Sequence, residues 1–569
     1  MCGIAGILDL ATPISPETLD RFTDSLAHRG PDGRGTWIGP GIGLGHRRLS
    51  ILDPTDAGAC PMEHVAPDGR RFRITFNGEV YNFLELRAEL EGEGWRFRSD
   101  TDTEVVVASF ARWGRGCQER FNGMWAFAIW DESARSLFMS RDRFGVKPLY
   151  YSAAGTRIAF ASEIKAFASL DGFRRELDLE VAAVSVERSQ ALEGGSDRTL
   201  MKGLNKLMPG HWLEVDREGR VTGGRWWNTM DHLVEVPSSR DERVARFREL
   251  FLDAVALRMR SDVAVGTCLS GGIDSTAVAS AMGWLHGEGR GELRRAPREW
   301  RRSFVASFPG SFIDETEHAT DAARHAGCEP SYWVFDPKRA LDDLLDSVWS
   351  MEEVYPGVAV PIWSLYREMR RAGVFVSLDG HGGDELLGGY TWYLDWPMDK
   401  VNANLESDFH RTLLPSILRN YDRCSMAHGI EVRMPFMDWR LVCLAFSLPP
   451  EDKIGGGFTK RVVRDALAGI MPDSIRRRRS KFGFNSPMIE WYNGGMIPLL
   501  SEVMSHPYWL ESPWWNGAEV RRDVLGRCAA KSWTMSDWNL SLETWSKLNI
   551  VLWTRMFVDG EVLRGGGVP

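Results

Sequence analysis

The hydrophobic pattern changes once along the chain. From residue 1 to about 228, short runs in which apolar and polar residues alternate are separated by Gly, Asn and Asp. Examples are GIGLGHRRLSI (41–51), RFRITFNGEVYN (71–82) and MWAFAIWDESARSLFMSRD (124–142). A period of two is typical of β-strands in hairpins. Helical patterns at 82–94 and 103–114 interrupt these runs, so this half is predicted to be α+β and mainly antiparallel.

A polar stretch at 236–243 marks the change. After it, apolar runs alternate with helical segments such as RALDDLLDSVWSM (339–351), a pattern that predicts an α/β fold with a parallel sheet. The apolar runs are VAVGTCL (263–269), SFVASF (303–308) and VFVSL (374–378). Beyond about residue 400 the pattern is mostly helical, and apolar residues from Trp538 to Met556 recur at helical spacing. We therefore expect two domains, 2–228 and 241–569, and a packed core helix near the end.

Composition and charge narrow the class of protein. Apolar residues make up 43% and charged residues 26%, the balance of an ordinary globular protein. The net charge is −9, so no global positive field favours nucleic acid, and the basic run RRRRSK (476–481) is interpreted as a solvated or substrate-gating loop. Eight cysteines without a CxxC pair, and no long apolar stretch, predict a cytoplasmic protein that does not span a membrane.

The second residue is a candidate nucleophile. Loss of Met1 would leave Cys2 with both a thiol and a free α-amine. The amine has an ordinary pKa of about 7.7–8.0 and the thiol one of about 8.5, so the amine can take the proton of the thiol near neutral pH. The apolar run CGIAGIL (2–8) suits a terminus buried in a sheet. Cys2 could therefore supply a nucleophile and its base.

Two loops of the second half could hold a nucleotide. VAVGTCLSGGIDSTAVASAM (263–282) places a strand, a Ser-Gly-Gly loop and a helix start in order, and backbone N–H groups at such a helix start favour phosphate. The acidic loop SLDGHGGDELLGGY (377–390) follows another apolar run and is expected at the same edge of the sheet. Asp274 and Asp384 are then candidate ligands for Mg²⁺ on ATP phosphates.

Five ordered motifs in the first half resemble the class II, N-terminal-nucleophile glutaminase domain. They are HRGPDGRG (28–35), RRLSILD (47–53), NGEVYN (77–82), SDTDTE (99–104) and RDRFGVKPLYY (141–151). The resemblance implies an Ntn-hydrolase sandwich of antiparallel sheets with flanking helices. It also implies that Arg48 binds the glutamine α-carboxylate, that Glu79 and Asp102 face its α-ammonium group, and that Asn77 with the Gly78 amide forms an oxyanion hole.

Motifs in the second half resemble the PP-loop ATP pyrophosphatases. SGGIDS (270–275) matches their phosphate loop, while DRCSMAHGIEVRMPFMD (422–438) and TKRVVRDAL (459–467) resemble the synthetase domain that carries it. The resemblance implies that Lys460 stabilises negative charge during adenylation. The ATP-binding residues it implies are Leu269, Ser270, Gly271, Gly272, Asp274, Ser275, Ala306, Asp379 and Gly380.

Taken in this order, the two halves resemble the glutamine-hydrolysing asparagine synthetases across nearly the whole chain. The resemblance implies that Cys2 releases ammonia from glutamine through a γ-glutamyl thioester. The ammonia would travel inside the protein to an acyl-adenylate of aspartate, giving asparagine, AMP, pyrophosphate and glutamate. ATP and Mg²⁺ are the implied cofactors, and aspartate is the expected acceptor. A homodimer is one of the assemblies that the sequence leaves open.

The acidic loop departs from the family pattern. Where asparagine synthetases typically read SGEGSDE, this chain reads DGHGGDE at 379–385, so three positions differ. His381 replaces a glutamate that, by resemblance, lies near the acyl-adenylate and the incoming amine. His381 could act as a base or only hydrogen-bond within a polar loop.

This departure leaves alternative functions open. The same machinery could amidate another carboxylate, such as a sugar, a peptide or a natural-product intermediate. The chain could also be an amide-forming cyclase or a silent binding protein, although both alternatives are disfavoured by the presence of Cys2 together with SGGIDS (270–275).

Overall fold

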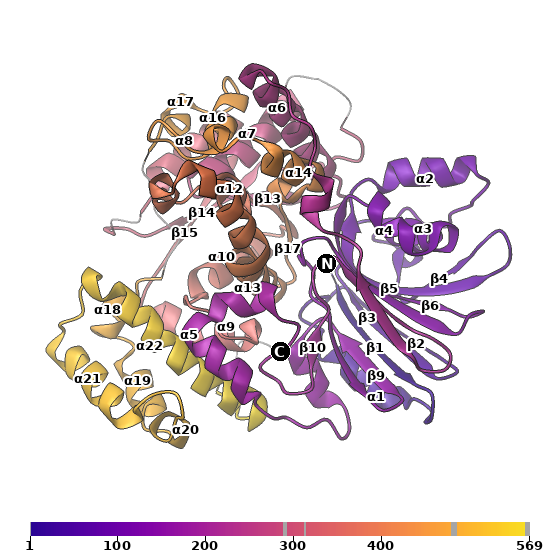
Figure 1. The fold of residues 1–569 in the computed structure, drawn as a ribbon, viewed down its shortest axis with the longest axis horizontal. Helices are drawn as coiled ribbons and strands as arrows, with labels where there is room; N and C mark the ends of the chain where they lie inside the picture. Colours follow the sequence, from indigo (N-terminus) through magenta and orange to yellow (C-terminus); the bar gives the residue numbers. More distant parts are fainter. Residues whose placement is uncertain (1, 288–292, 312–313, 480–485, 564–569) are drawn as a thin grey trace.

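The structure is a computed structural model that describes residues 2–287, 293–311, 314–479 and 486–563. Its first half contains two six-stranded sheets in which every neighbouring pair of strands is antiparallel (Figure 1). The first sheet runs in the order β10 (Asn205–Lys206), β8 (Tyr150–Ala154), β9 (Arg157–Ala161), β1 (Gly3–Asp9), β3 (Ile42–Arg48), β2 (Gly33–Gly39). The second runs β12 (Val221–Arg225), β11 (His211–Val215), β7 (Ser136–Arg141), β6 (Gly123–Asp131), β5 (Arg71–Val80), β4 (Met62–Val65).

The two sheets pack face to face because alternate residues of their strands are apolar. Ile4 and Leu8 of β1 share a core with Ala126, Ala128 and Trp130 of β6. On the outer faces, α1 (Pro16–Asp24) contacts β1 and β3, and α3 (Asp102–Trp113) contacts β5 and packs beside α2 (Phe83–Gly92). The remaining α-helices of this half are α4 (Cys117–Arg120) and α5 (Leu179–Gly195). The predicted antiparallel sandwich with flanking helices is confirmed.

A five-stranded parallel sheet organises the second half. Its order is β15 (Glu329–Val334), β14 (Arg302–Ser307), β13 (Val265–Cys268), β16 (Val376–Leu378), β17 (Glu431–Arg433). The three apolar runs that the sequence pattern assigned to a parallel sheet are β13, β14 and β16, which confirms that prediction. Since β14, β13 and β16 are adjacent and parallel, the loops at their carboxyl ends meet at one edge.

Helices cover this sheet and continue beyond it. Those around the sheet are α6 (Arg240–Arg258), α7 (Ile273–Gly287), α8 (Thr316–Ala326), α9 (Leu344–Met351), α10 (Val360–Arg371), α11 (Gly383–Leu387), α12 (Met398–Ser407), α13 (Leu414–Met426), α14 (Trp439–Ser447), α15 (Pro450–Lys453) and α16 (Arg461–Ala466). The last are α17 (Asp473–Arg476), α18 (Met488–Tyr492), α19 (Ile497–Val503), α20 (Pro507–Leu510), α21 (Gly517–Ala530) and α22 (Trp538–Trp553). Trp545, Leu548 and Leu552 are buried, so α22 is the predicted core helix. No helix within the described ranges is long and apolar enough to cross a bilayer.

Buried ion pairs join the two halves. Arg29 is fully buried, and its Nη1 lies 2.7 Å from Glu163 Oε1 and 2.9 Å from Oδ2 of Asp422 on α13. Arg423, the next residue of α13, lies 3.1 Å from Glu352, whose carboxylate also accepts hydrogen bonds from the backbone of Ile164 and Lys165. In Figure 1 the start of the chain lies at this boundary between the sandwich and the helical half.

We expect Arg29→Met to lower the free energy of unfolding by about 3–5 kcal/mol, because it removes a fully buried guanidinium that donates to two buried carboxylates. Equilibrium urea unfolding measures the change. Arg34→Met is the matched control, since Arg34 pairs with Asp20 and Asp24 at a partly exposed site and should cost less than about 1 kcal/mol. Equal losses for the two variants would contradict the role given to the buried pairs.

Candidate active sites

Cys2 is held between two hydrogen bonds at the entry to β1. Its backbone nitrogen donates to Asn77 Oδ1 at 3.1 Å, and its carbonyl accepts from Arg29 Nε at 3.1 Å. Burial raises the pKa of the Cys2 thiol. The thiol therefore needs a nearby base in order to react near neutral pH, which is the role predicted for its own α-amine.

Asn77 presents a free donor beside this cysteine. Its side chain is buried, Oδ1 is engaged by Cys2, and Nδ2 has no hydrogen-bond partner within the described part of the chain. Leaving such a donor unpaired costs about 1–3 kcal/mol, which a ligand oxygen would recover. Gly78 follows on β5, where a Cβ would lie 2.7 Å from the Cα of Trp125 on β6. The arrangement suits the oxyanion hole predicted for Asn77 and Gly78.

The other predicted glutamine contacts line one small cavity with Cys2. Arg48, Glu79 and Asp102 all lie in its wall, and its volume is about 30 Å³, close to the space of one water molecule. The Arg48 guanidinium donates to backbone carbonyls in the loop at 52–55, including that of Thr55 at 2.7 Å. Cys2 therefore shares this cavity with three of the residues predicted to bind glutamine.

Two buried carboxylates give the cavity its charge. Asp102 accepts a hydrogen bond from the Val80 N–H at 2.8 Å, and burial raises the pKa of Asp102 to about 6. Burial and the neighbouring Asp102 carboxylate raise the pKa of Glu79 well above its ordinary value, although Arg433 Nη2 lies 3.3 Å from its Oε1. An ammonium ligand would stabilise both carboxylates in their charged form.

This charge predicts a pH dependence. The Asp102 carboxylate of the free protein takes up a proton as the pH falls through about 6, and the neutral acid binds an α-ammonium group poorly. We expect the KM for glutamine to rise at least about tenfold per pH unit below 6, because protons on Asp102 and on Glu79, whose pKa is also raised, compete with the ammonium group. Glutaminase assays from pH 5 to 8 measure this, and a constant KM across pH 6 would contradict it.

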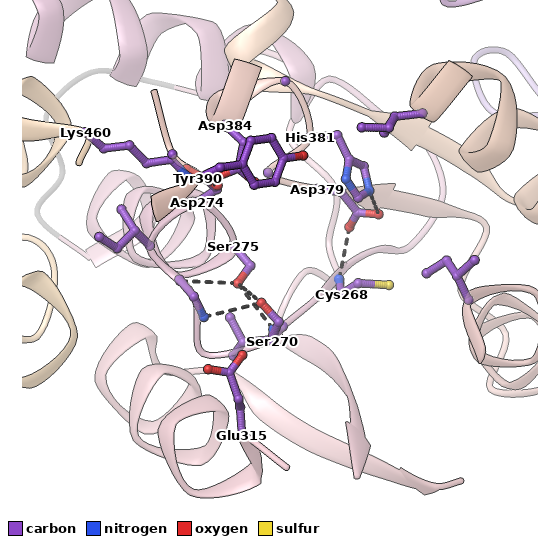
Figure 2. Close-up of a pocket in the computed structure, with 18 of the residues that line it drawn as sticks. Cys268, Ser270, Asp274, Ser275, Glu315, Asp379, His381, Asp384, Tyr390 and Lys460 are labelled. Carbon is purple, nitrogen blue, oxygen red and sulfur yellow. Dashed lines mark hydrogen bonds and ion pairs between the residues drawn. The ribbon is translucent and has the colours of Figure 1, made fainter. Parts of the chain in front are cut away.

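A second, larger cavity opens at the carboxyl edge of β13, β14 and β16 (Figure 2), with a volume of about 350 Å³. Most of the predicted ATP contacts are in its wall: Leu269, Ser270, Gly272, Asp274, Ser275, Ala306, Asp379 and Gly380. Gly271 lies outside the wall but makes the turn possible. Its φ is +71°, and a Cβ there would lie 2.6 Å from the Ala319 nitrogen.

Hydrogen bonds within the loop between β13 and α7 fix its conformation. Ser270 Oγ lies 3.0 Å from Ser275 Oγ and accepts the Gly272 N–H at 3.3 Å. These contacts hold the loop at the start of α7, where helix N–H groups face the cavity. A phosphate group would find its preferred environment here.

Lys460 joins the two carboxylates that the sequence assigned to magnesium. Its Nζ contacts Asp274 Oδ2 and lies 2.6 Å from Asp384 Oδ1. Burial alone would lower the pKa of Lys460, but these two carboxylates outweigh it and the pKa is raised, so the ammonium group stays charged. Because both carboxylates converge on one point, their oxygens fit a hard cation such as Mg²⁺. Within the described residues no group of three or more His, Cys, Asp or Glu side chains could hold a metal alone, so phosphate oxygens would complete the shell.

Asp379 and His381 lie on another side of this cavity (Figure 2). The Asp379 carboxylate accepts hydrogen bonds from the Cys268 N–H, the Ser377 hydroxyl and the Tyr366 hydroxyl, so it faces the protein interior. The His381 ring lies against the Tyr421 ring with centroids 3.4 Å apart. The sequence predicted Asp379 and His381 as site residues but did not predict Tyr366 or Tyr421.

Arg433 connects the two sites and was also missed. It is fully buried on β17, its Nη2 lies 3.3 Å from Glu79 in the cysteine cavity, and its carbonyl accepts the Asp379 N–H at 2.9 Å. The only signal was its position in the motif at 422–438. A charged residue within that short apolar stretch indicates a buried partner, but the sequence does not identify the partner.

Comparison with known proteins decides the family. A family model described as a glutamine amidotransferase domain matches residues 1–227, and one described as asparagine synthase matches 246–406 and 396–547. The chain is 32% identical over 548 residues to Asparagine synthetase [glutamine-hydrolyzing] 3 of Bacillus subtilis (strain 168), covering 84% of this chain and 86% of that protein. The chain belongs to the glutamine-hydrolysing asparagine synthetase family.

Other similar proteins are more diverse. Amidase chry2 of Gibberella zeae is 32% identical over 523 residues, which cover 86% of this chain and 76% of that protein. A solved glutamine phosphoribosylpyrophosphate amidotransferase of B. subtilis covers 58% of this chain and 81% of its own, at 17% identity and a TM-score of 0.31, which is too low a likeness to carry an argument. Family membership makes this chain a glutamine-hydrolysing carbon–nitrogen ligase that uses ATP.

Proposed function

We propose that this enzyme converts aspartate to asparagine with ammonia released from glutamine at Cys2 and with ATP activating the acceptor carboxylate. The observation that carries the proposal is that one buried arginine, Arg433, contacts a wall residue of each cavity: Glu79 beside Cys2 and Asp379 beside the nucleotide loop. Such a link supports a reaction in which one site supplies what the other consumes. Aspartate is proposed as the acceptor because of the family to which the chain belongs.

In the first half, the Cys2 thiolate would attack the side-chain amide carbon of glutamine once its α-amine has taken the thiol proton. Asn77 Nδ2, which is unpaired within the described residues, and the Gly78 N–H would donate to the oxyanion. Ammonia leaves and a γ-glutamyl thioester remains, which water hydrolyses to glutamate. Arg48, Glu79 and Asp102 would bind the two ends of the amino acid.

In the second half, the acceptor carboxylate would attack the α-phosphorus of ATP and displace pyrophosphate. Lys460 would stabilise the charge that shifts toward pyrophosphate as that bond breaks. Asp274 and Asp384 would hold Mg²⁺, which neutralises phosphate charge when bound. Ser270, Gly272 and Ser275 lie where the loop and the start of α7 would position phosphate oxygens.

A second candidate keeps this chemistry but uses another carboxylate. Beside Tyr421, the cavity is lined by the apolar or aromatic side chains of Tyr355, Ile362, Leu365 and Ile417. Two cationic residues of the cavity wall form ion pairs with acidic side chains. Lys460 contacts Asp274 and Asp384, and Arg478 contacts Glu315. An apolar wall favours a larger, less polar acid than aspartate.

Pyrophosphate release across a panel of acids separates the candidates. With ATP, Mg²⁺ and glutamine, aspartate should yield equal amounts of AMP, pyrophosphate, glutamate and asparagine. If aspartate gives no release above background and an aryl, sugar or peptide carboxylate does, the second candidate replaces the first. If no acid of the panel supports release, both candidates are wrong.

A further inference from the structure

Three polar groups fix the Asp379 carboxylate in one orientation. Its Oδ1 accepts the Cys268 N–H at 3.0 Å and the Ser377 hydroxyl at 2.6 Å, and its Oδ2 accepts the Tyr366 hydroxyl at 2.8 Å. The residue is 1% exposed. Its backbone N–H is in turn bound to the Arg433 carbonyl. A buried carboxylate with this many donors is held rigidly, and both of its oxygens already have hydrogen-bond partners within the protein.

His381 lies in the stretch Gly380–Gly383, in which every other residue is glycine. A Cβ at Gly380 would lie 2.6 Å from the backbone of Asp274, so the loop packs directly on the start of the nucleotide loop's helix. Gly382 has a φ of +88°, and a Cβ there would lie 2.6 Å from Met437 Sδ. The glycines on both sides therefore bring the His381 imidazole close to the position where ATP phosphates are expected.

Two neighbours orient this imidazole. Its Nε2 lies 3.5 Å from Asp379 Oδ2, is buried, and makes no hydrogen bond within the described chain that would compete with this contact. The ring rests on Tyr421 at a centroid distance of 3.4 Å and an interplanar angle of 31°. The side chain is 19% exposed and lines the cavity. With Nε2 directed at a carboxylate, the tautomer that carries its proton on Nε2 is favoured, which leaves Nδ1 as the acceptor.

Asp379 and His381 both differ from the family pattern SGEGSDE. In the pattern SGEGSDE, a small hydroxyl residue stands at position 379 and a carboxylate at 381. In this chain the carboxylate stands at 379 and an imidazole at 381. Positions 379 and 381 together still carry one acidic group, but it now lies behind the imidazole that lines the cavity.

We propose that Asp379 and His381 act as a carboxylate–imidazole pair in which His381 Nδ1 removes a proton from the attacking nitrogen and Asp379 positions the ring. The inference rests on the proposed adenylation chemistry. Ammonia forms a bond to the acyl carbon of the adenylate, and the resulting ammonium group loses one proton to Nδ1. The carbonyl then re-forms as the bond to the phosphate oxygen breaks, with its electron pair leaving on AMP. His381 is the catalytic residue and Asp379 the positioning residue.

The test uses the full-length protein with ammonium chloride as the nitrogen source, so glutamine hydrolysis is not involved. The acceptor is the acid that gives the highest pyrophosphate release in the panel. For His381→Gln we expect amide formation to fall by about 10²-fold or more, while the burst of pyrophosphate released in the first turnover changes less than threefold. Asp379→Asn should lower the kcat for amide formation about tenfold or more without a matching rise in the KM for the acceptor.

Two further variants separate positioning from packing. The double exchange Asp379→Ser with His381→Glu restores the family residues at these two positions and should recover amide formation relative to Asp379→Ser alone. His286→Gln is the matched control, because His286 is half-buried, stacks on Trp300 at 4.1 Å and lies outside the cavity wall. A loss of the first-turnover pyrophosphate burst in proportion to amide formation in His381→Gln would overturn the pair, since it would mean a binding or folding role.

A spectroscopic measurement needs no acceptor. In protein labelled with ¹⁵N-histidine, the wild type should show His381 as the Nε2–H tautomer, assigned by its loss in His381→Gln. In Asp379→Asn this population should shift toward the other tautomer. An unchanged His381 spectrum in Asp379→Asn overturns the inference even if the proposed reaction is correct. If instead the tautomer shifts but no acid releases pyrophosphate from the wild type, the proposed function has failed, and with it the catalytic role of His381.

Discussion

Replacing Cys2 by alanine should reduce glutamine-dependent amide formation by about 10³-fold or more, because Cys60, the other thiol in this cavity wall, is buried and has a pKa raised far above its ordinary value. Ammonia-dependent amide formation should change less than threefold. The two reactions separate because the nucleotide cavity does not include Cys2 in its wall. Parallel assays with glutamine and with ammonium chloride measure both rates on one preparation.

Cys328→Ala is the control for this substitution. Cys328 is a buried thiol between α8 and β15, remote in sequence from both sets of predicted site residues. Cys328→Ala should therefore keep both glutamine-dependent and ammonia-dependent amide formation. If Cys2→Ala kept glutamine-dependent activity, the nucleophile would have to be another group, and the oxyanion role of Asn77 would lose its basis.

The parts of each site that the sequence predicted are those whose chemistry lies in a short run of residues. Ser270, Gly272 and Ser275 are close along the chain and lie together in the cavity wall. Strand β5 was predictable because its apolar and polar positions alternate, and β6 because it is a short apolar run that ends at a turn. A strand as short as β17 gives no such pattern, so its charged residue Arg433 could not be placed.

Contacts between distant segments could not be predicted. Arg29 and Asp422 are 393 positions apart, and neither shows in sequence that the other is its partner. The same holds for the pairing of Glu79 with Arg433, which depends on how the sandwich docks on the parallel sheet. His381 was noticed because it breaks a family pattern, but its orientation by Asp379 and Tyr421 required coordinates.

Lys460→Gln should lower pyrophosphate release by about 10²–10³-fold, the size expected when a preorganised charge is removed from a buried site. The substitution also leaves the Asp274 and Asp384 carboxylates facing one another without the ammonium group that joins them. Lys460→Arg should restore little, because a planar guanidinium does not replace a compact ammonium group between two carboxylates. Lys531→Gln is the control, since Lys531 shares the left-handed backbone conformation of Lys460 but is exposed on the last turn of α21.

The same variant tests whether the halves work independently. Glutamine hydrolysis by Lys460→Gln should proceed within about threefold of the wild-type rate, because Cys2, Asn77 and Gly78 make no contact with Lys460. Glutamate would then accumulate without pyrophosphate, and its ratio to amide would rise by the factor that adenylation loses. If glutamine hydrolysis fell in parallel with adenylation, the cavities would be coupled energetically. The contact of Arg433 with Glu79 and with Asp379 would then be the first place to look for that coupling.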